Sequence, residues 1–416
     1  MGHTSAFRKP EADAPAYVDT SREDAVRGDL LTAGIRAPTL EQKVEFLSRS
    51  SAYAQPVTGV IRRETHMSCV FLAGDRVYKL KKPVRFAYLD FSNLGRREGA
   101  CRAELRLNRR LAPDVYLDVM PLTATPSGLA MGGDGPIMDW LVVMRRLDEA
   151  QTLEHAILEH RVEPWQLDRL IAALIQFYRR AERVFLSPAV HLRDWHQSLS
   201  DNLRVLLDPG LGLPSGLVRR VATVQRRFLS RQRKALAARL CSIVDGHGDL
   251  RPEHIWLGDP VRIIDCLEFN PRLRAVDPFD EIAFLSLECD RLGAAWTGRY
   301  IRRGVSRGLP DGVSDELFLF YRCNRAMLRA RLAIAHLMEP KPRTPEKWPH
   351  LARTYLAIAA ADAIRLERSF KTREGRPRPS PHRAAGSPRR EVARPVGYRP
   401  YRARAHLSAG RRAPHR

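Results

Sequence analysis

The stretch 247–270 carries the side chains that are best suited to chemistry. It begins His-Gly-Asp-Leu-Arg-Pro-Glu-His-Ile-Trp-Leu and, after a short turn, continues Arg-Ile-Ile-Asp-Cys-Leu-Glu-Phe-Asn. Asp249 lies two residues after His247, and His254 follows five residues further on. Asp265 ends the apolar run that comes next. A carboxylate that accepts a proton from a hydroxyl, followed by ligands for a divalent cation, is the order of parts that phosphoryl transfer from ATP requires.

Two apolar runs within 255–264 are expected to form a β-hairpin, because the tripeptide Gly-Asp-Pro between them favours a turn. We expect a register that pairs Leu257 with Arg262. The same register places His254 opposite Asp265, at the open end of the hairpin. Two side chains that converge in this way can hold a divalent cation.

The loop around Asp249 precedes this hairpin, and the carboxylate there can accept a proton from an attacking hydroxyl or orient it. His247 belongs to the same catalytic loop, and we expect it to brace the loop by hydrogen bonds. Asp280 stands at the expected start of a helix in Val-Asp-Pro-Phe-Asp-Glu-Ile-Ala. We expect Asp280 to cap that helix and to brace the loop as well.

A lysine and a glutamate upstream are suited to binding phosphate. The segment 76–83 is expected to be the second strand of a tight hairpin, with Lys79 and Lys81 on one face. Glu104 lies on the apolar face of the helix that follows, and a carboxylate in such a place needs a partner. Because the strand precedes this helix directly, we expect Lys79 to pair with Glu104.

The turn before that strand lacks the glycines of a Gly-x-Gly-x-x-Gly loop and reads Glu-Thr-His-Met-Ser over residues 64–68. Thr65, His66 and Ser68 are expected to cover the phosphates with their polar side chains and with backbone N–H groups. The adenine is expected beside the connector at 144–147.

Taken together, His-Gly-Asp-Leu followed by a strand and Ile-Asp resembles the aminoglycoside phosphotransferase and choline kinase-like family of the protein-kinase-like fold. The resemblance implies that Asp249 is the catalytic aspartate and Asp265 the metal-binding aspartate. It also implies that Lys79 and Glu104 form the pair that fixes a lysine on the α- and β-phosphates. ATP and Mg²⁺ are the implied cofactors, and a small-molecule hydroxyl is the implied acceptor.

The resemblance covers roughly residues 40–340 and is closest to one bacterial branch of the family. Two stretches carry the resemblance: Glu-Thr-His-x-Ser-x-Val-Phe-Leu-x-Gly-x-x-Val-Tyr-Lys-Leu-Lys-Lys-Pro and, further on, Glu-Leu-Arg-Leu-Asn-Arg-Arg-Leu-Ala-Pro. Some members of that branch have a second, P-loop ATPase domain. We expect that domain to be absent here, because the chain contains no Gly-x-x-x-x-Gly-Lys-[Ser/Thr] motif.

One residue departs from the family pattern. The family usually has Asn five residues after the catalytic aspartate, whereas this chain has His254. Imidazole is a poor ligand for Mg²⁺ and a better one for Mn²⁺. Three readings remain open: an altered metal site that uses Mn²⁺, a site that Glu268 helps to complete, and a degraded site that binds ATP without transferring phosphate.

The order of elements predicts an α+β class with a protein-kinase-like two-lobed fold, in which a small β-rich N-lobe precedes a larger, mainly helical C-lobe. The expected divisions are a flexible segment over 1–39, a nucleotide-binding N-lobe over 40–147, a helical C-lobe over 148–370 and a disordered basic tail over 371–416. The expected long helices of the C-lobe are 165–185, 217–240, 316–336 and 351–370.

The chain has a net charge of +23, and about half of that charge lies in the tail. From residue 371 onward there are 14 Lys and Arg against two Glu, without apolar periodicity. Such a composition cannot bury enough surface to order itself. The tail is therefore expected to be a solvated extension, with contact to nucleic acid or another polyanion as the alternative.

The six cysteines are scattered without a Cys-x-x-Cys pair, which favours reduced thiols in a cytoplasmic protein. The N-terminus does not read as a signal peptide, and no apolar run approaches the length of a membrane span. We expect no membrane partner.

Three functions are compatible with these features. The first is an ATP-dependent phosphotransferase that acts on a hydroxyl. The second is an ATP-binding, pseudokinase-like regulator. The third, a basic nucleic-acid-binding protein, is disfavoured, because the basic residues are not interleaved with aromatic ones and no nucleic-acid motif is present.

Overall fold

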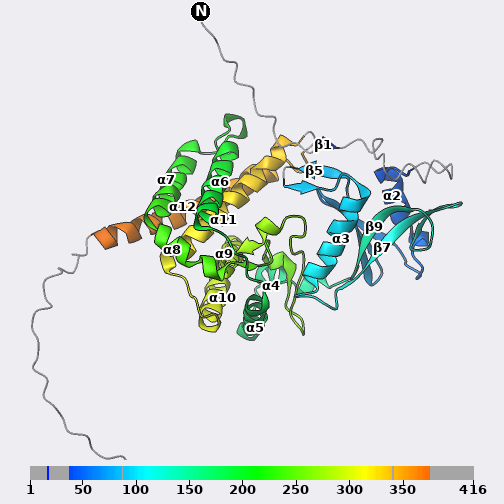
Figure 1. Ribbon diagram of the computed structural model, residues 1–416, viewed down its shortest axis with the longest axis horizontal. Coiled ribbons are helices and arrows are strands. Elements are labelled where there is room, and N and C mark those ends of the chain that lie inside the picture. The colour runs from blue at the N-terminus through cyan, green and yellow to red at the C-terminus, as the bar shows by residue number, and fades with distance from the viewer. Residues whose placement is uncertain (1–15, 18–36, 87, 340–341, 375–416) are drawn as a thin grey trace, which may run out of the picture. The chain divides into compact units, whose positions relative to one another are not determined.

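The computed structural model describes residues 16–17, 37–86, 88–339 and 342–374 (Figure 1). The chain divides into a unit from Met1 to Lys371 and a second unit from Thr372 to Arg416. Nearly all of the predicted N-terminal segment and of the predicted basic tail lies outside the described residues. The polyanion contact considered for the tail therefore lies outside them as well.

The N-lobe is built on a six-stranded antiparallel sheet with the strand order β2-β3-β4-β9-β7-β8. A smaller, three-stranded sheet has the strand order β1-β5-β6. The strands of the N-lobe are β1 Ala16–Tyr17, β2 Val60–Glu64, β3 Ser68–Ala73, β4 Arg76–Lys81, β5 Val84–Phe86, β6 Leu89–Asp90, β7 Tyr116–Thr125, β8 Gly128–Met131 and β9 Ile137–Arg145.

Two helices, α2 (Leu40–Leu47) and α3 (Leu94–Asn108), pack apolar side chains against the large sheet. Leu47 of α2 clusters with Leu141 of β9, whereas Cys101 of α3 clusters with Val142, the next residue along the same strand. Because successive strand residues point to opposite faces, the two helices contact opposite faces of β9. This explains why β9 is buried on both sides and does not alternate between polar and apolar residues.

The C-lobe is formed mainly by helices that surround α9 (Figure 1). α9 is buried along almost its whole length and packs against α10 and α11. The helices are α4 Leu153–Leu158, α5 Pro164–Arg180, α6 Pro188–Leu206, α7 Ser215–Arg231, α8 Arg233–Ala238, α9 Pro278–Arg291, α10 Ala295–Gly308, α11 Asp315–Ala335 and α12 Lys347–Glu374. The single helix expected over 217–240 is two helices, because Gln232 leaves helical dihedral angles.

Two short antiparallel strand pairs hold the segment 247–270 inside this helical lobe. β10 (Val244–Asp245) pairs with β13 (Ala275–Val276), and β11 (Ile255–Trp256) pairs with β12 (Arg262–Ile263). The predicted two-lobed α+β fold, with a β-rich N-lobe and a mainly helical C-lobe, is therefore confirmed. Within the described part of the chain, no helix is both long and apolar enough to span a membrane.

One buried carboxylate joins three elements of the N-lobe. Asp139 of β9 accepts hydrogen bonds from Nζ of Lys43 on α2, at 2.8 Å, and from Nε of Arg97 on α3, at 2.8 Å. All three side chains are buried. Burial opposes ionisation of Asp139, but the charges of Lys43 and Arg97 outweigh it and lower the pKa of the carboxyl.

We predict that Asp139→Ala destabilises the protein by about 3–5 kcal/mol, because it removes the carboxylate that neutralises two buried cations. Urea denaturation followed by circular dichroism measures this change. The matched control is Glu98→Ala, which breaks the surface pair of Glu98 with Arg102 and is expected to cost about 0.5 kcal/mol. Equal effects of the two substitutions would contradict the structural role of Asp139.

Candidate active site

A cavity of about 690 Å³ contains most of the predicted site residues. Its walls come from the strands of the N-lobe, the connector after β9, helix α4 and the catalytic segment of the C-lobe. The predicted site residues that line it are Thr65, Ser68, Lys79, Asp249, His254, Asp265 and Glu268.

Lys79 lies between two carboxylates that come from different lobes. Its Nζ is 2.8 Å from Oε1 of Glu104 on α3 and 3.0 Å from Oδ1 of Asp265, which follows β12. The Glu104 side chain is 1% exposed, whereas that of Asp265 is 45% exposed. Burial disfavours the ammonium form of Lys79, but the charges of Asp265 and Glu104 dominate and raise its pKa. Lys79 is therefore a fixed cation in the cavity.

Lys81, the next residue on the same face of β4, extends this arrangement. Its Nζ is 2.6 Å from Oε2 of Glu104 and 2.5 Å from Oε1 of Glu268, and its side chain is fully buried. The second oxygen of Glu104 is thus occupied by Lys81. Lys81 lies on the predicted face of β4, but its two partners were not predicted, and Glu268 was expected only as a metal ligand.

The backbone at Asp265 adopts a φ of 62°, a left-handed conformation that is costly for a residue with a side chain. The Asp265 N–H donates to Oη of Tyr116 at 3.2 Å, and the N–H of Cys266 donates to Oδ1 of Asn108 at 2.9 Å. The charge of Lys79 lowers the pKa of Asp265 far below its ordinary value, against the opposing effect of burial. Asp265 is therefore an ionised carboxylate that faces the cavity.

Glu281 of α9 supports the loop that carries Asp249. Its carboxylate accepts from the backbone N–H of His247, at 3.2 Å, and from that of Gly248. Gly248 has a φ of 86°, and a Cβ atom there would lie 2.9 Å from the Leu267 side chain, so this position requires glycine.

The expected role of Asp280 was wrong. Helix α9 begins at Pro278 with Asp277 as its N-cap, and the side chain of Asp277 accepts from the N–H of Phe279. Asp280 lies in the first turn, where both of its oxygens bind Arg325. The residue that braces the loop is the next one, Glu281, whose side chain is completely buried.

His247 is buried and braces the loop, as its hydrogen bonds show. Its Nε2 lies 2.9 Å from the carbonyl oxygen of Ile264, and its Nδ1 accepts from the N–H of Asp249 at 3.2 Å. Burial, together with the neighbouring His254, lowers the pKa of His247 to about 4. The imidazole is therefore neutral at pH 7, with Nε2 donating and Nδ1 accepting.

Asp249 carries an ion pair that was not predicted from the sequence. Its Oδ2 lies 2.8 Å from Nη2 of Arg251, two residues further on. Burial alone would raise the pKa of Asp249, but the charge of Arg251 outweighs it and lowers the pKa. Asp249 is thus ionised and oriented by Arg251.

His254 lies between the two aspartates. Its Nδ1 is 2.9 Å from the backbone carbonyl oxygen of Asp249, and its Nε2 is 3.5 Å from Oδ2 of Asp265. Nη2 of Arg251 also approaches Nε2, at 3.1 Å. The structure therefore brings together three predicted site residues, Asp249, His254 and Asp265.

The predicted hairpin register was wrong by one residue. Trp256, not Leu257, pairs with Arg262, so His254 is bonded to Ile264 and not opposite Asp265. The cause lies outside the hairpin. The N–H of Leu257 donates to the carbonyl oxygen of Gln151, and the Arg262 side chain is held by Asp114.

Thr65 and Ser68 line the cavity, and the Thr65 hydroxyl accepts from the N–H of Ser68 at 3.0 Å. The connector at 144–147 also contributes to the cavity wall. His66 is not among the lining residues and instead contacts His336 and Glu339 of the C-lobe.

No protein-family model matches the chain. Curated proteins from Mycobacterium tuberculosis and Mycobacterium bovis, described as uncharacterised, are 34% identical to it over 324 residues. The match covers 75% of this chain and 60% of each mycobacterial protein. The chain thus spans less than two thirds of the length of these curated relatives.

Among solved structures, the chain is similar to a choline/ethanolamine kinase family protein from Mesorhizobium loti, with 18% identity, coverage of 77% of this chain and 99% of that chain, and a TM-score of 0.44. A thermostable mutant of the aminoglycoside phosphotransferase APH(4)-Ia gives 13% identity, coverage of 78% and 98%, and a TM-score of 0.46. A glucosamine kinase gives 14% identity, coverage of 78% and 79%, and a TM-score of 0.44.

We predict that the pH dependence of stability depends on His247. Its pKa of about 4 in the folded protein lies below the ordinary value of about 6.5, so the unfolded chain binds the proton more tightly. The stability from this group is complete above pH 6.5 and is lost as the pH falls through 4, and it amounts to about 3 kcal/mol. Urea denaturation between pH 7 and pH 4 measures this loss.

In that experiment His247→Gln should give a flatter stability profile than the wild-type protein. His196→Gln, which replaces an exposed histidine of α6, should leave the profile unchanged. A His247→Gln profile as steep as that of the wild-type protein would show that the folded protein does not hold this imidazole neutral.

Proposed function

We propose that the protein is an ATP-dependent phosphotransferase that moves the γ-phosphate of ATP to a hydroxyl group of a small-molecule acceptor. The observation that carries the proposal is the convergence of Lys79, Asp249 and Asp265 on one cavity. These residues come from β4, from the loop after β10 and from the segment after β12. A fixed cation, an ionised carboxylate and a second carboxylate exposed to the cavity are the parts that phosphoryl transfer needs.

The N-lobe residues would bind the nucleotide. Lys79, held by Glu104, is placed to neutralise the α- and β-phosphates, and Thr65 and Ser68 offer hydroxyls at the edge of the same cavity. Val77, Met144 and Leu147 supply apolar wall where the connector leaves β9. This apolar region suits the faces of an adenine ring.

The C-lobe residues would position the acceptor and a divalent cation. Asp249 is ionised, so it can orient a hydroxyl and accept its proton. Asp265 and the Nε2 atom of His254 would form a mixed oxygen and nitrogen donor pair for a divalent cation, better suited to Mn²⁺ than to Mg²⁺, once Nη2 of Arg251 leaves its position 3.1 Å from Nε2. Such a cation, when bound, neutralises charge on the β- and γ-phosphates.

The second candidate is an ATP-binding regulator that transfers phosphate weakly or not at all. Two observations favour it: His254 occupies the position of the usual asparagine, and Arg251 is already paired with the Asp249 carboxylate. The two candidates share nucleotide binding and differ in turnover.

We predict that Asp249→Asn lowers the rate of ADP formation by about 10²–10⁴-fold while ATP binding is retained, because the amide cannot accept the proton. Radiolabelled ATP measures turnover, alone and with a panel of hydroxyl acceptors, in the presence of Mg²⁺ or Mn²⁺. The control is Asp259→Asn, which changes an exposed aspartate in the turn after β11. If the wild-type protein and both variants bind ATP but turn it over equally slowly, the result would favour the ATP-binding regulator.

We predict that His254→Asn raises the rate with Mg²⁺ relative to the rate with Mn²⁺, because an amide oxygen replaces a nitrogen beside Asp265. The ratio of the two rates, measured at saturating ATP, reports the change. An unchanged ratio would exclude His254 from the metal site.

A further inference from the structure

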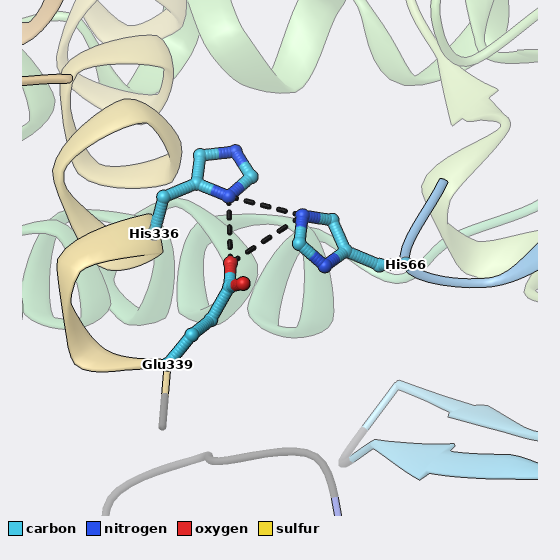
Figure 2. A group of neighbouring side chains, drawn as sticks. All are labelled: His66, His336 and Glu339. Atoms are coloured by element: carbon cyan, nitrogen blue, oxygen red, sulfur yellow. Dashed lines mark hydrogen bonds and ion pairs between the residues drawn. The ribbon is translucent and has the colours of Figure 1, made fainter. Parts of the chain in front are cut away.

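Three potential metal ligands meet outside the cavity, at a point where the two lobes touch (Figure 2). Nε2 of His66 is 3.0 Å from Nδ1 of His336, which in turn is 2.7 Å from Oε1 of Glu339. The remaining separation, from His66 to Glu339, is 3.4 Å. His66 comes from the turn between β2 and β3, whereas His336 begins the 3₁₀ turn His336–Met338 after α11 and Glu339 directly follows that turn.

The two shortest contacts in this cluster share Nδ1 of His336, so one proton position on that atom cannot serve both contacts fully. If Nδ1 of His336 carries a proton, it can donate to Glu339, but it then has no lone pair for a proton on His66. If it lacks the proton, its lone pair faces a carboxylate oxygen. When both ring nitrogens are unprotonated, three acceptor atoms lie within 3.4 Å of one another, and a cation is the group that satisfies all three.

We propose that His66, His336 and Glu339 form a binding site for a divalent transition metal of the Zn²⁺ type. Two imidazole nitrogens and a carboxylate oxygen form a donor set that Zn²⁺ accepts and Mg²⁺ does not prefer. Tetrahedral Zn²⁺ keeps its ligand atoms about 3.3 Å apart, close to the separations of 2.7–3.4 Å in this cluster. A water molecule would complete the coordination.

The surroundings of the cluster favour this site. The His336 ring stacks on Trp348, with centroids 3.8 Å apart, and this contact fixes the direction of the imidazole. Two nearby cations, Lys82 and Arg343, are both paired with the carboxylate of Glu64.

The position of the site gives it a consequence for the cavity. His66 lies between Thr65 and Met67, both of which line the cavity. A metal ion at this site ties the β2–β3 turn to the end of α11 in the C-lobe, and it thereby restrains the turn over the place proposed for the phosphates. This coupling rests on the proposed function, whereas the metal site itself does not.

The test is a titration of the chelator-treated, full-length protein with Zn²⁺ alone, followed by competition with a chromophoric chelator. We expect His66→Ala, His336→Ala and Glu339→Gln each to weaken one Zn²⁺ site by at least about tenfold, since even residues that only support a ligating histidine contribute 10–100-fold. The matched control His196→Ala and the active-site variant Asp265→Asn should both retain the site. Circular dichroism without Zn²⁺ verifies that each variant is folded.

The proposal is overturned if the wild-type protein and the three cluster variants titrate alike, or if Asp265→Asn is the substitution that abolishes Zn²⁺ binding. A second measurement tests the coupling: Zn²⁺ should raise the affinity for a non-hydrolysable ATP analogue by about fivefold or more in the wild-type protein and not in His336→Ala. If no nucleotide binds, the proposed function fails, and the titration with Zn²⁺ alone still decides the metal site.

Discussion

The cost of burying charge is the constraint on which the rest of the active site depends. Lys79 and Lys81 extend from one face of β4 into a region that is almost closed to water, and each would be strongly unfavourable there without carboxylates. Glu104 binds both lysines, one through each oxygen. Because the remaining partners, Asp265 and Glu268, belong to the C-lobe, the same requirement joins the two lobes across the cavity.

This network explains why each neighbouring element lies where it does. Helix α3 must pack against the sheet so that Glu104 reaches β4, and the segment after β12 must follow a left-handed backbone at Asp265 to bring its carboxylate to Lys79. The loop that carries Asp249, in turn, is held by Glu281 of the buried helix α9. The reactive groups are thus positioned by buried elements, and the side chain of Asp265 stays open to the cavity.

The lobes, most of the strands and the Lys79–Glu104 pair could be predicted from the sequence, because each depends on local periodicity or on one isolated polar residue in an apolar face. The hairpin register could not, because Gln151 and Asp114, distant in sequence, hold Leu257 and Arg262. The support of the loop by Glu281 was missed because Asp280 and Glu281 are adjacent acids, and only packing shows which of them Arg325 neutralises. The contact of His66 with His336, 270 positions away, had no local signal.

The most direct test of the central claim is a double-mutant cycle on the binding of a non-hydrolysable ATP analogue with Mg²⁺, measured by titration calorimetry. The proteins are the wild type, Lys79→Met, Glu104→Gln and the double variant. If Glu104 acts by holding Lys79 on the phosphates, Glu104→Gln weakens binding in the wild-type background and adds little once Lys79 is absent. We predict a coupling free energy of about 0.5–3 kcal/mol. Equal losses from Glu104→Gln in both backgrounds would contradict the account.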